Sequence, residues 1–201
     1  MRPLLHVLAV TACLSLAPAA QAEGDAEQGK LLAQTCMGCH GAPGMRNAYP
    51  GFRVPKLGGQ HDFYVVRALK AFQDERRPHP TMQAQAADLT EQEMADIAAY
   101  FASLGEPASN DVSDDNPAQQ CAACHNADGN SPSDPEATQG APILAGQYPE
   151  YLVHTLREYK SGARQDPVMN GMAAGLSESQ MKTISDFYYR QDGLAAPNIA
   201  E

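Results

Sequence analysis

The segment Cys36-Met37-Gly38-Cys39-His40 decides how this chain folds, and the chain contains it twice. Cys121-Ala122-Ala123-Cys124-His125 repeats the pattern 85 residues later. Two thiols three positions apart, followed directly by an imidazole, form the attachment signature of c-type haem. Each sulfur adds to a vinyl group of the porphyrin, and the histidine binds the iron. The sequence therefore predicts two covalently bound haem c groups. The predicted thioether residues are Cys36, Cys39, Cys121 and Cys124, and the predicted iron ligands are His40 and His125.

Two other kinds of site also use paired cysteines. Two such pairs can hold a tetrahedral zinc ion, and one pair can act as a redox dithiol. The histidine that follows both pairs favours haem, as does the lack of any other cysteine after residue 22. Zinc and dithiol chemistry remain the alternatives.

The repeat extends beyond the cysteines, with an offset of 87 residues. It matches Pro55 with Pro142, Leu57 with Leu144, Gln60 with Gln147, Tyr64 with Tyr151, and Met82 with Met169. One module has thus been duplicated. A module of fewer than about 90 residues buries only a small core by itself, and a large apolar cofactor would enlarge that core. We expect a first domain over residues 23–105, a linker over 106–117 and a second domain over 118–201.

Hydrophobic periodicity and capping residues predict an all-α fold with long loops. In the first copy we expect helices over residues 25–34 and 61–75, and another beginning at Thr90. In the second copy we expect a shorter helix from Pro117, one over 149–161, and one beginning at Ser177. Met82 and Met169 are expected on the loops that precede the last helices.

The second axial ligand of each iron should recur in both copies. No histidine outside the two motifs recurs, and only two pairs of methionines do. Met94 and Met181 follow capping boxes that begin at Thr90 and Ser177, which predicts that these two methionines belong to the core. Met82 and Met169 are therefore the predicted iron ligands, with a simple covering of the haem edge as the alternative.

The first 22 residues resemble a secretory signal peptide: Arg2, an apolar run, then small residues ending at Ala22. This predicts export to the periplasm. A lipoprotein signal ending at Cys13 is the alternative. The net charge of −10 disfavours binding to nucleic acid and favours partners with basic surfaces. Residues 23–110 have eight basic and eleven acidic side chains, and residues 111–201 have five and thirteen.

The segments Val54-Pro55-Lys56-Leu57-Gly58-Gly59-Gln60 and Ala141-Pro142-Ile143-Leu144-Ala145-Gly146-Gln147 resemble the loop of the cytochrome c4 family, which are bacterial dihaem cytochromes. The likeness covers nearly the whole chain after residue 22. It implies two tandem class I cytochrome c domains, each enclosing one haem. It also implies that the carbonyls of Pro55 and Pro142 accept hydrogen bonds from His40 and His125.

The resemblance implies an electron carrier rather than an enzyme. Its donor would be a cytochrome bc complex or another protein, and its acceptor a terminal oxidase or a periplasmic reductase. We expect a monomer, with at most loose membrane association. A cytochrome subunit of a larger oxidoreductase and a dihaem enzyme such as a peroxidase are the alternatives. Two features depart from the family pattern: the loop over residues 41–52, and Asp114 at the place that Gly29 occupies in the first copy.

Overall fold

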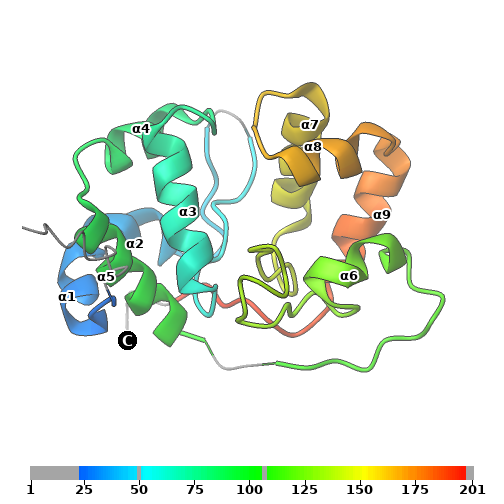
Figure 1. Cartoon of the computed structure of the whole chain (residues 1–201), viewed down its shortest axis with the longest axis horizontal. Helices are drawn as coiled ribbons and strands as arrows, with labels where there is room; N and C mark the ends of the chain where they lie inside the picture. Colours follow the sequence, from blue (N-terminus) through cyan, green and yellow to red (C-terminus); the bar gives the residue numbers. More distant parts are fainter. Residues whose placement is uncertain (1–22, 49–50, 106–107, 198–201) are drawn as a thin grey trace, which may run out of the picture.

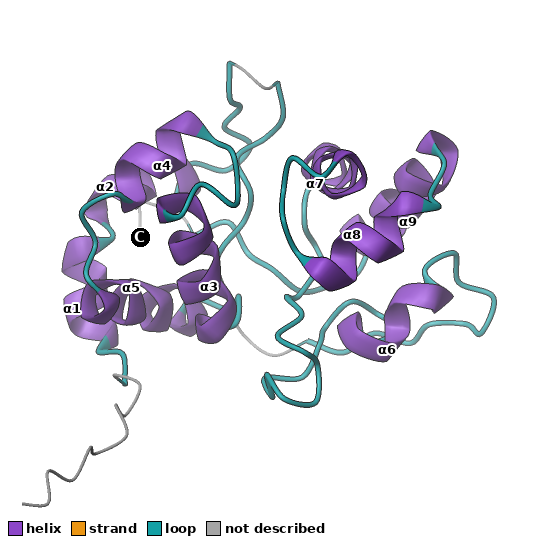
Figure 2. Cartoon of the chain, turned by 45° about the horizontal axis from the view of Figure 1, so that its top comes forward, coloured by secondary structure: helices purple, strands orange, loops and turns teal. Residues whose placement is uncertain are grey.

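The structure is a computed structural model that describes residues 23–48, 51–105 and 108–197. The predicted signal peptide therefore lies outside the described residues. The described part is built from helices joined by long loops (Figure 2), and its only β-type pairings are isolated bridges. None of the described helices is both long and apolar enough to cross a membrane. The all-α prediction is confirmed.

The two copies of the repeat form the two halves of the molecule (Figure 1). The helices of the first half are α1 (Ala26–Leu32), α2 (Gln34–His40), α3 (Asp62–Gln73), α4 (Pro80–Ala86) and α5 (Glu91–Ser103). The second half contains a 3-10 turn η1 (Gln119–Cys121), then α6 (Ala122–His125), α7 (Pro149–Ser161), α8 (Pro167–Ala174) and α9 (Glu178–Tyr189). The helices α7, α8 and α9 each begin 87 residues after α3, α4 and α5, so the sequence repeat is also a structural one.

Each half has its own hydrophobic core. In the first half the core lies between α3 and α5, and in the second between α7 and α9. The capping boxes at Thr90 and Ser177 are both present. Met94 and Met181 are 1% and 0% exposed, which confirms that they are core residues. Each last helix is thus fixed at its start by a cap and along its length by burial.

The first half has a packed N-terminal helix that the second half lacks. Asp25 caps α1 and also donates its own backbone N–H to Asp96 of α5, at 2.8 Å. Gly29 allows the two helices to cross closely, because a Cβ placed there would lie 1.9 Å from the carbonyl oxygen of Asp96. In the described part of the second half, only η1 lies before α6, the helix that contains the motif histidine. The change from Gly29 to Asp114 therefore coincides with the loss of a whole helix.

The predicted positions of Met82 and Met169 need correction. Both residues lie within the short helices α4 and α8, not on loops. Proline is the first residue of each helix, and the side chain of His79 or Asp166 accepts backbone N–H groups at its start. A capping side chain followed by proline favours a helix start, whereas the prediction from sequence treats the proline as a loop signal.

The loop after the first motif, which departs from the family pattern, reaches the second half. The N–H of Gly44 donates to the hydroxyl of Tyr148 at 3.2 Å. The guanidinium of Arg53 forms two hydrogen bonds with the carboxylate of Glu150, one of them 2.9 Å long. Phe52 is buried against the ring of His154, with 4.6 Å between the ring centroids. This loop therefore joins the two halves.

The C-terminal segment crosses in the opposite direction, from α9 back to the first half (Figure 1). Ala195 exchanges two backbone hydrogen bonds with Gly58, of 2.9 and 3.0 Å. Each half thus sends a segment onto the other.

Candidate haem-binding sites

A cavity of about 280 Å³ lies between the two halves and opens into both. Its walls include every residue that the sequence predicts for the two sites: Cys36, Cys39, His40, Pro55, Met82, Cys121, Cys124, His125, Pro142 and Met169. Apolar side chains of α3, α5 and α7 complete the walls, among them Val65, Leu69, Phe101 and Leu152. The fold therefore brings each motif, its proline and its methionine to a shared apolar space.

The imidazole of His40 is held in the form that an iron ligand requires. Its Nδ1 lies 2.9 Å from the carbonyl oxygen of Pro55. A carbonyl can only accept, so Nδ1 carries the hydrogen. Burial lowers the pKa of His40 to about 4, so the ring is neutral at neutral pH. In this tautomer Nε2 has no hydrogen, and its lone pair is available to a metal.

His125 has the same arrangement in the second half. Its Nδ1 donates to the carbonyl oxygen of Pro142 at 2.9 Å, and burial lowers its pKa. Both histidines end a helix that begins near the cysteines, α2 in the first half and α6 in the second. The sequence motif therefore places the thiols and the imidazole at one wall of the cavity.

The four cysteines of the motifs form no disulfide with one another, so their sulfurs are available for thioether bonds to haem. The residues that the structure describes contain no group of three or more histidine, cysteine or acidic side chains able to hold a metal ion.

The cavity has the features of a space for a large, mostly apolar group. Among its lining residues, Thr155 and Ser185 bury hydroxyl oxygens that have no hydrogen-bond partner among the described residues. Such groups are costly unless something satisfies them. Met82 and Met169 are half-buried on α4 and α8 and supply the thioethers of the lining. These residues fit a porphyrin held through two thioether bonds, with histidine and methionine on its iron.

A set of contacts across the interface was missed by the sequence prediction. Arg77 donates to the hydroxyl of Tyr151 at 2.6 Å, and Arg164 donates to the hydroxyl of Tyr64 at 3.0 Å. Both arginines are buried. Burial alone would raise the pKa of Tyr64, but the guanidiniums of Arg164 and Arg77 lower it to about 8. The signal was present in the sequence, since Arg77 and Arg164 are also 87 residues apart.

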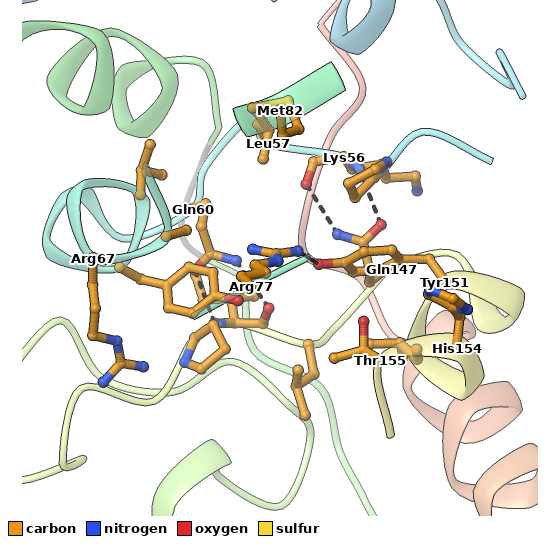
Figure 3. Close-up of a pocket in the computed structure, with 18 of the residues that line it drawn as sticks. Lys56, Leu57, Gln60, Arg67, Arg77, Met82, Gln147, Tyr151, His154 and Thr155 are labelled. Carbon is orange, nitrogen blue, oxygen red and sulfur yellow. Dashed lines mark hydrogen bonds between the residues drawn. The ribbon is translucent and has the colours of Figure 1, made fainter. Parts of the chain in front are cut away.

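The two glutamines of the family loop also bond across the interface (Figure 3). The carboxamide of Gln147 bonds both the N–H and the carbonyl of Lys56, at 3.0 Å each. The carboxamide of Gln60 does the same with Ile143, also at 3.0 Å each. Figure 3 shows Arg77 between Gln60 and Gln147. The interface therefore has an approximate twofold symmetry that follows the repeat.

Comparisons with known proteins agree with this architecture. The family model for cytochrome c matches residues 26–105. A cytochrome c4 of Pseudomonas aeruginosa is 33% identical, over 93% of this chain and 98% of its own length. A thiosulfate dehydrogenase electron acceptor of Stutzerimonas stutzeri is 28% identical, over 78% of each chain.

A solved structure extends the likeness to the whole arrangement. The crystal structure of reduced recombinant cytochrome c4 from Pseudomonas stutzeri is 28% identical and superposes with a TM-score of 0.65. The match covers 86% of this chain and 100% of that one. The protein thus has two tandem class I cytochrome c domains and two covalently bound haem c groups. By its sequence repeat, its fold and its relatives, the chain belongs to the cytochrome c4 family.

Proposed function

We propose that this dihaem cytochrome carries electrons between protein partners in the periplasm, with one histidine and one methionine on each iron. The proposed ligands are His40 with Met82 and His125 with Met169. The donor would be a cytochrome bc complex or another respiratory protein, and the acceptor a terminal oxidase or a periplasmic reductase. The observation that carries the proposal is that both methionines line the same cavity as the two motif histidines, at equivalent places in the repeat.

The residues explain what such a site can do. Haem supplies one-electron redox chemistry when bound, and methionine ligation raises its potential relative to two histidines. The histidines stay neutral and oriented because Pro55 and Pro142 accept their Nδ1 hydrogens. If Met82 and Met169 bind the irons together with His40 and His125, no position would remain on either iron for a substrate. This arrangement favours electron transfer over catalysis.

The ligands can be tested by near-infrared absorption, because ferric haem with a methionine ligand has a characteristic charge-transfer band. We expect the wild-type protein to show the band at an intensity for two haems. Replacement Met82→Ala or Met169→Ala should remove about half of it.

The matched controls are Met94→Leu and Met181→Leu, which change the two recurring methionines of the core. Both should retain the full band. A wild-type protein without the band, or a band that persists at full intensity in both alanine variants, contradicts the proposed ligands. An alkaline pyridine spectrum of each variant counts the haems and separates loss of ligand from loss of haem.

Charge supports a partner with a basic surface. Residues 111–201 have a net charge of −8 from five basic and thirteen acidic side chains, compared with −3 for residues 23–110. We therefore propose that the second half makes the stronger electrostatic encounter. Rates of electron transfer to a basic partner should fall as ionic strength rises, and rates indifferent to salt contradict this part of the proposal.

The second candidate is a cytochrome subunit that receives electrons from one dedicated enzyme. The relative from Stutzerimonas stutzeri named as a thiosulfate dehydrogenase electron acceptor favours it. Purification of the native protein distinguishes the two functions, since a dedicated subunit remains with its enzyme at fixed stoichiometry. Turnover of peroxide by the purified ferric protein would instead support the dihaem peroxidase.

A further inference from the structure

We propose that Gln60 and Gln147 are positioning residues that act across the interface, each tuning the haem site of the opposite half. Gln147 would act on the site of His40, and Gln60 on the site of His125. This inference rests on the proposed function in one respect, namely that the two histidines bind iron.

The first step of the argument concerns one peptide group. The carbonyl of Pro55 accepts the hydrogen of His40 Nδ1 at 2.9 Å. The N–H at the other end of the same peptide belongs to Lys56, and it donates to Oε1 of Gln147 at 3.0 Å. A single planar amide therefore connects the histidine of the first half with the glutamine of the second.

The second step is the electronic coupling within that amide. Resonance links the nitrogen and the oxygen of a peptide group. When the N–H donates a hydrogen bond, the carbonyl oxygen becomes a better acceptor, so consecutive hydrogen bonds strengthen one another. The bond between Lys56 and Gln147 thus strengthens the bond between Pro55 and His40. A stronger acceptor at Nδ1 makes the imidazole a more basic ligand, which favours the ferric state.

The third step is that the glutamine cannot easily move away. Gln147 is 4% exposed, and its Nε2 also donates to the carbonyl of Lys56 at 3.0 Å. Its Oε1 further accepts the N–H of Tyr148 at 3.1 Å, at the start of α7. The carboxamide is therefore held at both ends, and it fixes the backbone next to Pro55.

The same hydrogen bonds recur between the histidine of the second half and the glutamine of the first. His125 donates to Pro142, the N–H of Ile143 donates to Oε1 of Gln60 at 3.0 Å, and Gln60 is 3% exposed. Gln60 Nε2 returns a bond to the carbonyl of Ile143 at 3.0 Å. The same arrangement is thus kept in both copies of the repeat, with matching distances, and this supports a shared role for the two glutamines.

Each glutamine should affect the haem of the opposite half, and the experiment tests this by replacing one glutamine at a time. Methionine has nearly the shape of glutamine without its hydrogen-bonding groups, so the variants are Gln147→Met and Gln60→Met. Redox titration followed by paramagnetic proton NMR reports the two haems separately. Variants that lack one cysteine pair assign the signals.

We expect Gln147→Met to raise the potential of the haem on His40 and to leave that on His125 unchanged. Gln60→Met should do the reverse. At a fixed ambient potential, the ratio of ferric to ferrous haem at the affected site should fall by a factor of about two to five.

The matched control is Glu150→Gln, which weakens another contact between the halves without touching either histidine or proline. This variant should not reproduce the crossed pattern, in which the substitution raises only the reduction potential of the haem in the opposite half. A shift in the half that contains the substituted glutamine, an equal shift of both haems, or no shift beyond that of the control overturns the proposal. Gln147→Ser and Gln60→Ser serve as a second pair if a methionine variant fails to fold.

Failure of this proposal can be distinguished from failure of the proposed function. If the histidines or methionines do not bind iron, the wild-type protein lacks the near-infrared band for two methionine-ligated haems. If only the crossed coupling is absent, that band is intact and the glutamine variants give the wild-type potentials.

Discussion

The two halves of the molecule are alike at the centre of their interface and different on their outer sides. At the interface, Gln60 and Gln147 make the same pair of hydrogen bonds, and the arginine and tyrosine contacts are also mirrored. On the outside, α1 packs against α5 in the first half, whereas the described residues of the second half contain only η1 before α6, the helix of its motif histidine. Duplication has thus been followed by divergence at the periphery.

The difference shows which contacts constrain a duplicated module. A side chain at the interface has a partner in the other copy, so a change there breaks a contact of both halves and leaves buried polar groups unpaired. A helix on the outside contacts only its own half. The following predictions use this comparison, in order of decreasing effect.

Loss of haem should affect the second half more than the first. One double variant combines Cys121→Ala with Cys124→Ala, and the other combines Cys36→Ala with Cys39→Ala. We expect each double variant to keep one haem per chain. The second half lacks a helix equivalent to α1, so the double variant at Cys121 and Cys124 should lose more helical signal in far-UV circular dichroism than the double variant at Cys36 and Cys39. Equal losses in the two variants would show that α1 does not stabilise the first half without its haem.

Closer packing at the α1 crossing should destabilise the first half alone. Gly29→Ala places a methyl group against the carbonyl of Asp96, and we expect a loss of about 2 to 3 kcal/mol in the free energy of unfolding. The control is Gly171→Ala on α8, where a Cβ meets nothing within 4 Å. It should instead stabilise by about 0.5 to 1 kcal/mol. Thermal unfolding of the haem-loaded variants measures both, and an unaffected Gly29→Ala variant contradicts the packing argument.

The contact between Arg53 and Glu150 should stabilise the paired halves in a pH-dependent way. The hydrogen bonds from Arg53 lower the pKa of Glu150 to about 2, from an unfolded value near 4.5. A lowered carboxylate pKa stabilises the folded state above the unfolded value, and that stability is lost as pH falls from about 4.5 to 2. Glu150→Gln should therefore cost about 1 to 2 kcal/mol at neutral pH.

The same variant should show a smaller decline of stability between pH 4.5 and pH 2 than the wild type. The control is Glu178→Gln, which removes an exposed contact with Arg157 inside the second half. No measurable change is expected there, because solvent screens exposed ion pairs. Parallel acid-unfolding curves for wild type and Glu150→Gln contradict the role of this pair.

The smallest loss of stability should come from removing a capping box, and it should be equal in the two halves. Thr90→Ala and Ser177→Ala each remove one capping box, and each should lower the free energy of unfolding by about 1 kcal/mol. Chemical denaturation measures the two losses. A clear inequality between them would show that the two last helices are not equivalent, despite their common start in the repeat.

Much of this protein can be predicted from its sequence because the decisive signals are local. Two thiols and an imidazole within five residues identify a haem attachment site without knowledge of the fold. The caps at Thr90 and Ser177 likewise act within one helical turn, and the structure contains both. The local signal was misinterpreted at Pro80 and Pro167, since proline occurs both in loops and at the first position of a helix.

Tertiary structure alone decided how the two halves meet. The repeat indicates that Gln60 and Gln147 are equivalent, but not that each bonds to the peptide next to the other half's proline. Those partners are 83 and 91 residues apart in sequence, and no local propensity encodes their encounter. Contacts of this kind depend on the docking of the two halves, and docking depends on shape, charge and buried polar groups contributed by both halves together.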